Sequence, residues 1–277
     1  MKQNSKCQEK QDIRVVIGNP PYSVGQKSQN DNAKNLNYPK LDSHIHETYV
    51  AQSKAICLRS LYDSYIRAIR WASDRINDAG VIGFVTNAGF INAYSMDGLR
   101  KCLSEEFSSI CVFNLRGNKR KDMVSKGRTQ EGQNVFGSGS MTAIAITILV
   151  KNPKVQEPCK IYYYDIGNKP TRKEKLSEIQ CFGSIGGIKR ENGWQAIIPD
   201  KHGDWLNQRN SDFEKLLALG DRKGNSIKLF ETFFGGIQTN RDAWAYNSSR
   251  EALAKNMSNM IVFYNSEMKR FNATFPL

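Results

Sequence analysis

The first half of the chain alternates short runs of branched apolar residues with longer amphipathic segments. The run Ile13–Ile17 is typical of a buried strand, and it ends at an Asn-Pro-Pro sequence because proline cannot donate to a strand ladder. From Leu58 to Ile76, apolar residues recur at helical spacing, and Val81–Thr86 predicts the next strand. The polar, asparagine-rich stretch Ser23–Glu47 predicts a long loop between the first strand and this helix.

The same alternation continues further along the chain. A second helix is predicted around Leu99–Phe107, followed by a strand over Ile110–Leu115. Strand, helix, strand, helix, strand is the pattern of a parallel α/β sheet. Two more strands, Ala143–Val150 and Lys160–Asp165, follow without an intervening helix, so we expect antiparallel pairing at that edge of the sheet. Beyond Gly167 the periodicity weakens and tryptophans become frequent, which indicates a different kind of segment.

Composition narrows the class of protein. With 39% hydrophobic residues among 277, the chain is not globally disordered. Its longest nearly apolar run, Ala143–Val150, has 8 residues. A membrane-spanning helix needs about 18, so we expect no membrane partner. The N-terminus has no apolar core of a secretory signal, and the six cysteines form no CxxC pair. They are typical of reduced thiols in a cytoplasmic protein.

The charge balance adds a candidate partner. Forty Lys and Arg residues against 27 Asp and Glu give a net charge of +13. Such an excess favours a polyanion such as nucleic acid, and less often an acidic membrane surface. A soluble protein that is merely basic is the alternative.

Ligands of open α/β sheets bind at the carboxyl ends of the strands. Three such ends follow from the predicted strands: Asn19–Tyr22, Asn87–Phe90 and Arg116–Lys121. If the strands are parallel, these three segments meet at one edge of the sheet.

The first of these segments has the most specific chemistry. Asn19 offers a side-chain acceptor, and the carbonyl of Pro20 can act as a second one because the diproline fixes the backbone. Tyr22 offers a flat ring for stacking. Two acceptors beside a ring suit a planar ligand with an exocyclic amino group, such as adenine. A rigid turn with a packed tyrosine is the alternative.

The context of this motif resembles a known enzyme family. From Ile13 to Pro153, a strand ending in GNPPY, a helix and a GVIGFVTN strand resemble the N6-adenine DNA methyltransferases of the amino-methylating class. The strings NPPYSVGQKSQNDN, LYDSYIRAIRWASDRI, GLRKCLSEEFSSICVFNLRGN and FGSGSMTAIAITILVKNP look like the methyltransferase segment of restriction–modification enzymes that join helicase and methyltransferase in one polypeptide. Thr239–Trp244 resembles a stretch that lies between their methyltransferase and target-recognition parts.

The resemblance implies a fold and an organisation. The fold would be α/β: part of a Rossmann-like S-adenosylmethionine-dependent methyltransferase sheet, its C-terminal half, followed by a mixed α/β segment. Residues 1–12 would be disordered or a truncation scar, 13–167 the C-terminal part of the catalytic domain, and 168–277 a linker and the start of the target-recognition region.

It also implies roles for single residues. Asn19 and the Pro20 carbonyl of the Asn-Pro-Pro-Tyr motif, which Pro21 completes, would accept hydrogen bonds from N6 of a flipped adenine, with Tyr22 stacked on the base. S-adenosylmethionine would donate the methyl group. Phe136 would pack against the target base, although it could also be an ordinary loop phenylalanine. Tyr65 would lie on the helix that lines the cofactor adenine, although most helix aromatics are simply core.

The basic stretch after the third strand is predicted to contact double-stranded DNA. Arg116–Arg128 holds six basic residues and one acid, and a solvated loop is the alternative. The residues expected at the phosphates are Lys27, Arg116, Lys119, Arg120, Lys121, Lys126 and Arg128. No metal is expected, because His44 and His46 have no further ligands in an evident cluster.

The match breaks before the motif. Methyltransferases of this family bind the cofactor through a glycine-rich loop and an acidic residue that precede Asn-Pro-Pro-Tyr, whereas here only 18 residues precede Asn19. We therefore expect an excised piece, a natural remnant, or a chain completed by another polypeptide, with little methyl transfer by itself and an exposed apolar sheet edge. A DNA-binding module without chemistry is the rival hypothesis.

Overall fold

A computed structural model gives the structure of the protein. It describes residues 11–21, 38–124, 131–137, 140–168, 171–206, 208–210, 212, 215–220, 227–232, 239 and 242–275. Packing divides the chain into two units, Met1–Asn210 and Ser211–Leu277. Each unit is described by itself.

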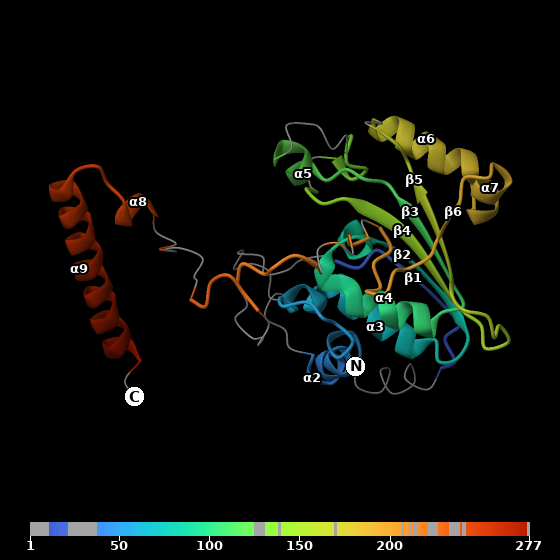
Figure 1. Cartoon of the computed structure of the whole chain (residues 1–277), viewed down its shortest axis with the longest axis horizontal. Helices are drawn as coiled ribbons and strands as arrows, with labels where there is room; N and C mark the ends of the chain where they lie inside the picture. The colour runs from blue at the N-terminus through green and yellow to red at the C-terminus, as the bar shows by residue number, and fades with distance from the viewer. Residues whose placement is uncertain are drawn as a thin grey trace. The chain divides into compact units, whose positions relative to one another are not determined.

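The first unit is built on a six-stranded mixed sheet (Figure 1). Its strands are β1 (Val15–Gly18), β2 (Gly80–Asn87), β3 (Ser109–Asn114), β4 (Ile144–Lys151), β5 (Lys160–Asp165) and β6 (Gln195–Ile197), in the order β1-β2-β4-β3-β5-β6. β1 is parallel to β2, and β5 is parallel to β3. β4 runs antiparallel to both β2 and β3, and β6 runs antiparallel to β5.

The antiparallel strand is not where the sequence pattern places it. We expect antiparallel pairing at one edge of the sheet, but β4 lies in the middle, between β2 and β3, and β5 is parallel to β3. The composition of β4 explains its position. Except for Thr147, the residues from Ile144 to Val150 are apolar. The successive side chains of Ile144 and Ala145, which point to opposite faces of the sheet, are both fully buried, as in a strand covered on both faces.

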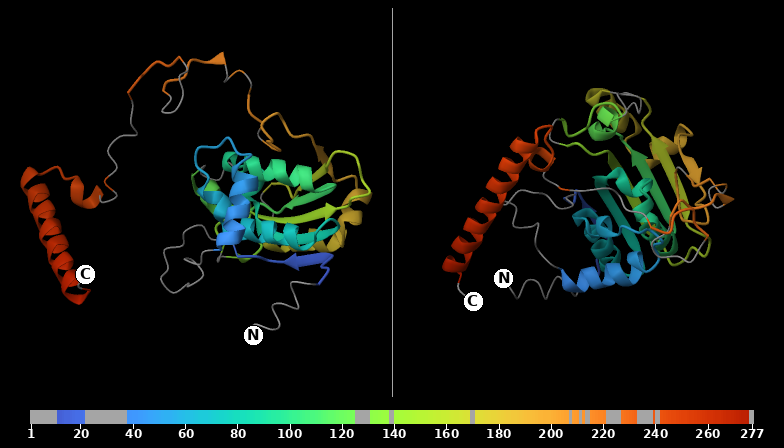
Figure 2. Two further views of the ribbon diagram at one scale, coloured as in Figure 1. Left: turned by 90° about the horizontal axis from the view of Figure 1, so that it is seen from below. Right: turned by 60° about the vertical axis from the view of Figure 1, so that its left-hand side comes forward.

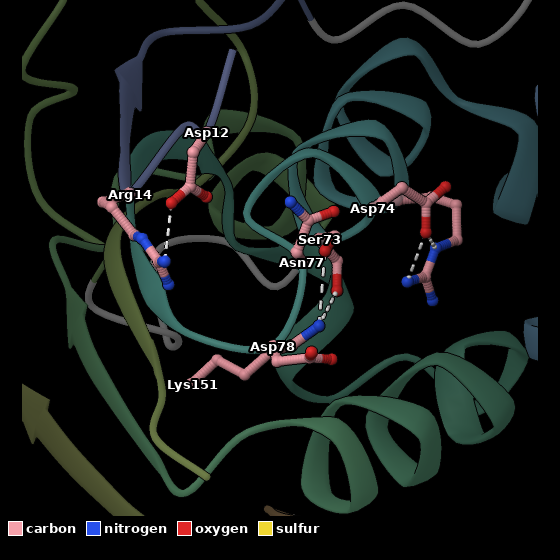
Figure 3. A pocket seen from close by; sticks show the side chains of 8 residues that line it. Asp12, Arg14, Ser73, Asp74, Asn77, Asp78 and Lys151 are labelled. Atoms are coloured by element: carbon pink, nitrogen blue, oxygen red, sulfur yellow. Dashed lines mark hydrogen bonds and ion pairs between the residues drawn. The ribbon is translucent and has the colours of Figure 1, made fainter. Parts of the chain in front are cut away.

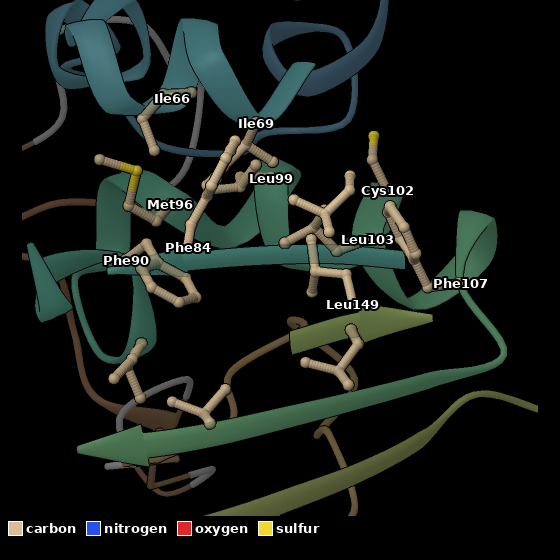
Figure 4. Close-up of a cluster of buried hydrophobic side chains, with 14 of the residues drawn as sticks. Ile66, Ile69, Phe84, Phe90, Met96, Leu99, Cys102, Leu103, Phe107 and Leu149 are labelled. Carbon is tan, nitrogen blue, oxygen red and sulfur yellow. The ribbon is translucent and has the colours of Figure 1, made fainter. Parts of the chain in front are cut away.

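Two helices cover one face of the sheet. They are α3 (Ser64–Arg75) and α4 (Asp97–Glu106). Figure 4 shows the apolar layer between them and the strands, where Ile69 and Leu103 from the helices meet Leu149 from β4. All three side chains are buried. This layer fixes β2, β3 and β4 relative to one another.

Part of the expected loop Ser23–Glu47 is helical. Pro39–Ile45 forms α2, and His46–Val50 continues it as one turn of π-helix. Proline at the start of α2 suits the first helical turn, where its missing N–H costs nothing. Ile45 and Tyr49 are four residues apart and fully buried against the core. The loop expectation is therefore wrong for this part, because burial of one apolar stripe outweighs the polar composition.

The other face of the sheet is covered near β3 and β5. The covering elements are α6 (Arg172–Phe182) and α7 (Ile185–Arg190), which pack Phe182 and Ile188 against Phe113. β6 then pairs with β5. As a packing unit the first body thus continues to Asn210. The expected change of role near residue 167, from catalytic domain to linker, stays a prediction.

β1 is the outer strand of the described sheet. Figure 2 shows it, in blue, at the margin, with β2 as its partner. Val15 is 58% and Ile17 81% exposed. The expectation of a buried strand over Ile13–Ile17 is thus wrong for these two side chains, because no described element packs on their side of β1.

Two helices lie in the described part of the second unit. They are α8 (Asp242–Ala245) and α9 (Arg250–Thr274), and the hydroxyl of Ser249 caps α9 by accepting a hydrogen bond from the N–H of Ala252 at 3.3 Å. Ile261 and Phe271 on α9 are more than half exposed. No helix in the described part of the chain is long and apolar enough to cross a membrane.

Candidate active site at the carboxyl edge of the sheet

Four strands end at one edge of the sheet. Because β2 and β3 both run antiparallel to β4, they are parallel to each other, and β1 and β5 share their direction. The segments that follow Gly18, Asn87 and Asn114 therefore leave from the same side, which we call the carboxyl edge. The prediction that the three segments begin at one edge of the sheet is confirmed, whereas the cavity at this edge is lined by residues of the second and third segments and not by Asn19 or Pro20.

Asn19 and Pro20 lie where β1 ends at this edge. Gly18 is paired with Phe84 of β2, whose ring lies 3.5 Å from the position of a Cβ at Gly18. Asn19 and Pro21 are exposed and Pro20 is partly buried. Tyr22, the fourth residue of the motif, lies outside the described residues, as does Lys27.

A polar cavity of about 380 Å³ opens at the carboxyl edge. Asn87 contributes from the end of β2, Asn114 from β3, and Asp165 from β5. The other polar residues that line it are Asn92, Arg116, Asn118, Lys121, Glu131 and Tyr163. Amide groups thus reach the cavity from the ends of β2 and β3, which lie on either side of β4, and each offers a donor and an acceptor.

A hydrogen-bonded chain crosses one wall of the cavity. Nδ2 of Asn114 donates to the hydroxyl of Tyr163 at 2.8 Å, and this hydroxyl donates to Oδ2 of Asp165 at 2.8 Å. Nε of Arg116 pairs with Oδ1 of Asp165 at 2.6 Å. Burial raises the pKa of Tyr163, so its phenol stays protonated and fixed as a donor.

The residues that form this chain include two that the sequence pattern misses, Tyr163 and Asp165. Both lie in β5, which brings them to the carboxyl edge because β5 is parallel to β3. The rule that ligands bind at carboxyl ends would find Asp165 once the direction of β5 is known.

The expected basic loop begins with a helix. Lys119–Val124 forms α5 directly after β3. Arg120 is exposed on this helix. Lys119 donates to the carbonyl of Gly137 at 3.3 Å, and Lys121 lies 3.4 Å from Oε1 of Glu131. Lys126 and Arg128 lie outside the described residues. The alternative of a solvated loop is thus wrong for the α5 part, which is helical and in which two lysines also contact other groups of the protein.

Phe136 and Tyr65 differ in their surroundings. Phe136 lies in the segment that leads toward β4, and its side chain is 45% exposed. Tyr65 lies on α3 with 1% exposure, inside the main apolar core. The structure thus presents Phe136 to solvent and encloses Tyr65. The roles of both residues stay predictions.

A second cavity, of about 510 Å³, lies at the opposite edge of the sheet (Figure 3). Its charged lining residues are three aspartates and three cations: Asp12, Asp74, Asp78, Arg14, Arg70 and Lys151. Several pair with each other or with nearby groups, as Arg14 does with Asp12 at 2.6 Å and Arg70 with Glu106 at 2.5 Å. Because its charges balance, this cavity does not favour a polyanion.

The described residues also bear on metal binding. Among them, no three His, Cys, Asp or Glu side chains gather closely enough to hold a metal ion. Nδ1 of His44 contacts Oδ2 of Asp74 at 3.0 Å, and this pair lies away from the carboxyl edge.

Comparison with known proteins identifies the segment. Residues 1–120 match the profile of the Eco57I restriction-modification methylase family, and residues 228–275 match the Type ISP C-terminal specificity domain. Among solved structures, the chain is similar to the ATP-dependent Type ISP restriction-modification enzyme LlaBIII bound to DNA, with 42% identity and a TM-score of 0.87 over 96% of this chain. The chain corresponds to the methyltransferase segment of Type ISP restriction–modification enzymes.

Further structures support this family. A nuclease-deletion mutant of the Type ISP enzyme LlaGI in complex with a DNA substrate mimic has 42% identity and a TM-score of 0.83 over 99% of this chain. A DrdV–DNA complex has 31% identity and a TM-score of 0.80 over 96% of it. The chain spans 17%, 25% and 26% of the lengths of the LlaBIII, LlaGI and DrdV chains. No curated protein matches the sequence significantly.

Proposed function

We propose that this chain carries the target-base side of the active site of an S-adenosylmethionine-dependent adenine-N6 DNA methyltransferase. We further propose that it acts as part of a longer restriction–modification polypeptide, here called the parent polypeptide, because it spans only 17% to 26% of the related chains. The observation that carries the proposal is the position of Asn19 and Pro20. They lie exposed or partly exposed at the end of β1, on the edge where three other strands end.

The proposed chemistry uses two acceptors. Oδ1 of Asn19 and the carbonyl oxygen of Pro20 accept hydrogen bonds from the two N6–H groups of an adenine that has left the duplex. These hydrogen bonds localise the nitrogen lone pair, which is otherwise delocalised into the ring. Catalysis on this side is therefore a matter of positioning and electrostatics, and it needs no covalent enzyme intermediate. Phe136 packs against the base, and Tyr22 stacks on it.

S-adenosylmethionine supplies the methyl group when bound. The described residues do not fit a complete pocket for it, because no described element covers the outer side of β1, where Ile17 is 81% exposed. We therefore propose that other parts of the parent polypeptide hold most of the cofactor. The chain described here is proposed to contact the target base and the surrounding DNA.

Duplex DNA is the proposed substrate. The net charge of +13 supports it, and the relatives LlaBIII and LlaGI were solved with DNA or a DNA mimic. The proposed phosphate contacts are the basic residues at and after α5. They follow β3 at the carboxyl edge, the same edge of the sheet at which Asn19 and Pro20 follow β1.

We expect Arg120→Ala to weaken duplex binding equally on all sequences. Each phosphate contact releases counterions, so loss of one should reduce the slope of log affinity against log salt by about 0.9. The measurement is fluorescence anisotropy of a labelled duplex titrated with the chain at several salt concentrations. Lys154→Ala is the matched control, because Lys154 is an exposed cation at the opposite edge of the sheet. An equal change of slope in both variants would contradict the placement of DNA at α5.

The second candidate function is a DNA-binding module without chemistry. The exposed outer side of β1 favours it, because no described residue closes a cofactor pocket there. The two functions differ in whether binding of S-adenosylmethionine changes the affinity for duplex DNA. If the methyltransferase proposal is right, S-adenosylmethionine tightens duplex binding by the parent polypeptide, and Tyr22→Ala reduces that tightening. Calorimetric titration with and without duplex measures it. Duplex binding that is indifferent to the cofactor and to Tyr22 supports the module instead.

A further inference from the structure

The proposed chemistry leaves a buried lysine unused. Lys175 lies on α6 and its side chain is fully buried. Its Nζ donates to the carbonyl of Leu115 at 2.6 Å and to the carbonyl of Glu131 at 3.2 Å. Lysine is rarely buried completely, and burial lowers the pKa of Lys175 to about 8. A methionine would fill a similar space without burying a charge. The role of Lys175 is therefore sought in the hydrogen bonds that its ammonium group makes.

The two carbonyls belong to segments that are joined at this point. Leu115 directly follows β3, and Glu131 begins the described segment 131–137. The N–H of Gly117 donates to the carbonyl of Glu131 at 3.0 Å, and Nδ2 of Asn134 donates to the carbonyl of Gly117 at 3.2 Å. Lys175 thus bonds to the backbone on both sides of the junction.

The turn at this junction is conformationally demanding. Arg116 has a φ of 53° and Gly117 a φ of 93°, in the left-handed region that side chains other than glycine rarely adopt. A Cβ at Gly117 would lie 3.0 Å from Cα of Asn134. Such a backbone persists only where its surroundings hold it. The ammonium of Lys175 supplies two of the hydrogen bonds that do so.

The same segment carries Phe136. Oδ1 of Asn134 accepts the N–H of Phe136 at 2.9 Å, and the carbonyl of Asn134 accepts the N–H of Gly137 at 3.0 Å. Arg172, also on α6, donates from Nε to the carbonyl of Val135 at 2.8 Å. The backbone that leads into Phe136 is therefore held by α6 at two points, Glu131 and Val135, while the ring of Phe136 is 45% exposed.

We propose that Lys175 is a positioning residue that fixes segment 131–137, so that Phe136 is presented to the target base. The inference rests on the proposed function, because it concerns the base contact of that site. Lys175 itself does not touch the base, and Arg172 acts in the same way from the surface of α6. The helix that follows β5 thus contributes to the site by fixing the backbone of segment 131–137.

The test is a double-mutant cycle in the parent polypeptide. Lys175→Met and Phe136→Ala are made singly and together, and the single-turnover rate of methyl transfer to DNA is measured. Loss of position costs roughly 10-fold or more. We expect Lys175→Met to lower the rate by this order when Phe136 is present, and to have little further effect in the Phe136→Ala background. A purely structural role would lower the rate by the same factor in both backgrounds.

Two further variants serve as controls for the role of Lys175. Arg172→Ala removes the surface contact to Val135 without opening the buried site, and we expect a smaller loss that also disappears in the Phe136→Ala background. Lys173→Ala removes the neighbouring exposed lysine and should leave the rate unchanged. Equal losses from Lys175→Met with and without Phe136 overturn the inference. A Phe136→Ala variant as fast as wild type overturns it as well. A wild-type parent polypeptide that transfers no methyl group removes the proposed function itself.

Discussion

Replacing Asn19 by alanine is expected to lower methyl transfer by the parent polypeptide roughly 100-fold or more, the cost of losing one positioned hydrogen-bonding group in an active site. The side-chain acceptor is lost, and the Pro20 carbonyl alone cannot hold both amino protons. Asn19 is exposed at the end of β1, so the fold should not change. The measurement is the single-turnover rate with saturating DNA and cofactor.

The control for this variant is an asparagine remote from the carboxyl edge. Asn152 is exposed and follows β4 at the opposite edge, where its Oδ1 accepts the N–H of Lys154 at 3.1 Å. Asn152→Ala should transfer methyl groups as fast as wild type. Duplex affinity should be the same for both variants, because Asn19 acts on the flipped base and not on the phosphates. Asn19→Ala at the wild-type rate would show that the base is held elsewhere.

Replacing Asp204 by alanine is expected to lower the free energy of unfolding by about 3–5 kcal/mol, the cost of leaving a buried charge without its partner. Asp204 is 2% exposed and Arg100 on α4 is 1% exposed. Oδ1 of Asp204 accepts a hydrogen bond from Nη2 of Arg100 at 2.5 Å, and Oδ2 accepts one from Nε of Arg209 at 2.8 Å.

The remaining donors of Arg100 are bound to the backbone. Nε donates to the carbonyl of Gly203 at 2.8 Å, and Nη1 donates to the carbonyls of Phe90 and Ala93. The pair thus ties the segment after β6 to α4 and to the short helix that follows β2. With Asp204 gone, the guanidinium keeps these neutral acceptors but has no carboxylate.

Urea unfolding of the chain measures this effect. Trp205 reports on it locally, because the indole is 3% exposed and meets Phe90 edge-on with ring centroids 6.1 Å apart. Glu157→Ala is the control, since Glu157 pairs with Lys160 in an exposed contact, and its unfolding midpoint should not move. An unfolding midpoint in Asp204→Ala that equals wild type would contradict the role of the buried pair.

The first three strands of the first unit are predictable from sequence because each is a compact run of mainly branched apolar residues. Val81–Thr86 and Ile110–Leu115 differ from β2 and β3 by about one residue at each end. Their shared direction, and hence the meeting of Asn19 and Asn87 at one edge, follows from the helices between them. The proposed base site could therefore be located without coordinates.

The order of the later strands could not be predicted. The pattern of β4 shows an apolar strand but not which neighbours it pairs with, because pairing is decided by contacts far apart in sequence. The pairing partner of β5 could not be predicted for the same reason. The positions of Tyr163 and Asp165 in the wall of the cavity depend on that pairing, so they could not be predicted either.

The buried ions are the other part that sequence does not show. Arg100 and Lys175 both lie on helices, where a charged residue usually faces solvent. Their partners Asp204 and Leu115 lie 104 and 60 residues away. Nothing local distinguishes Lys175 from the exposed Lys173 on the same helix. The support of the Phe136 segment by α6 is therefore visible only in the structure.

The most direct test of the central claim is the identity of the methylated base. The parent polypeptide is incubated with unmethylated duplex DNA and S-adenosylmethionine labelled at its methyl group, and the DNA is digested to nucleosides and separated. We expect the label in N6-methyldeoxyadenosine, in an amount that Asn19→Ala strongly reduces. Label in a methylated cytosine, or no label in DNA from an active cofactor-binding preparation, would contradict the account.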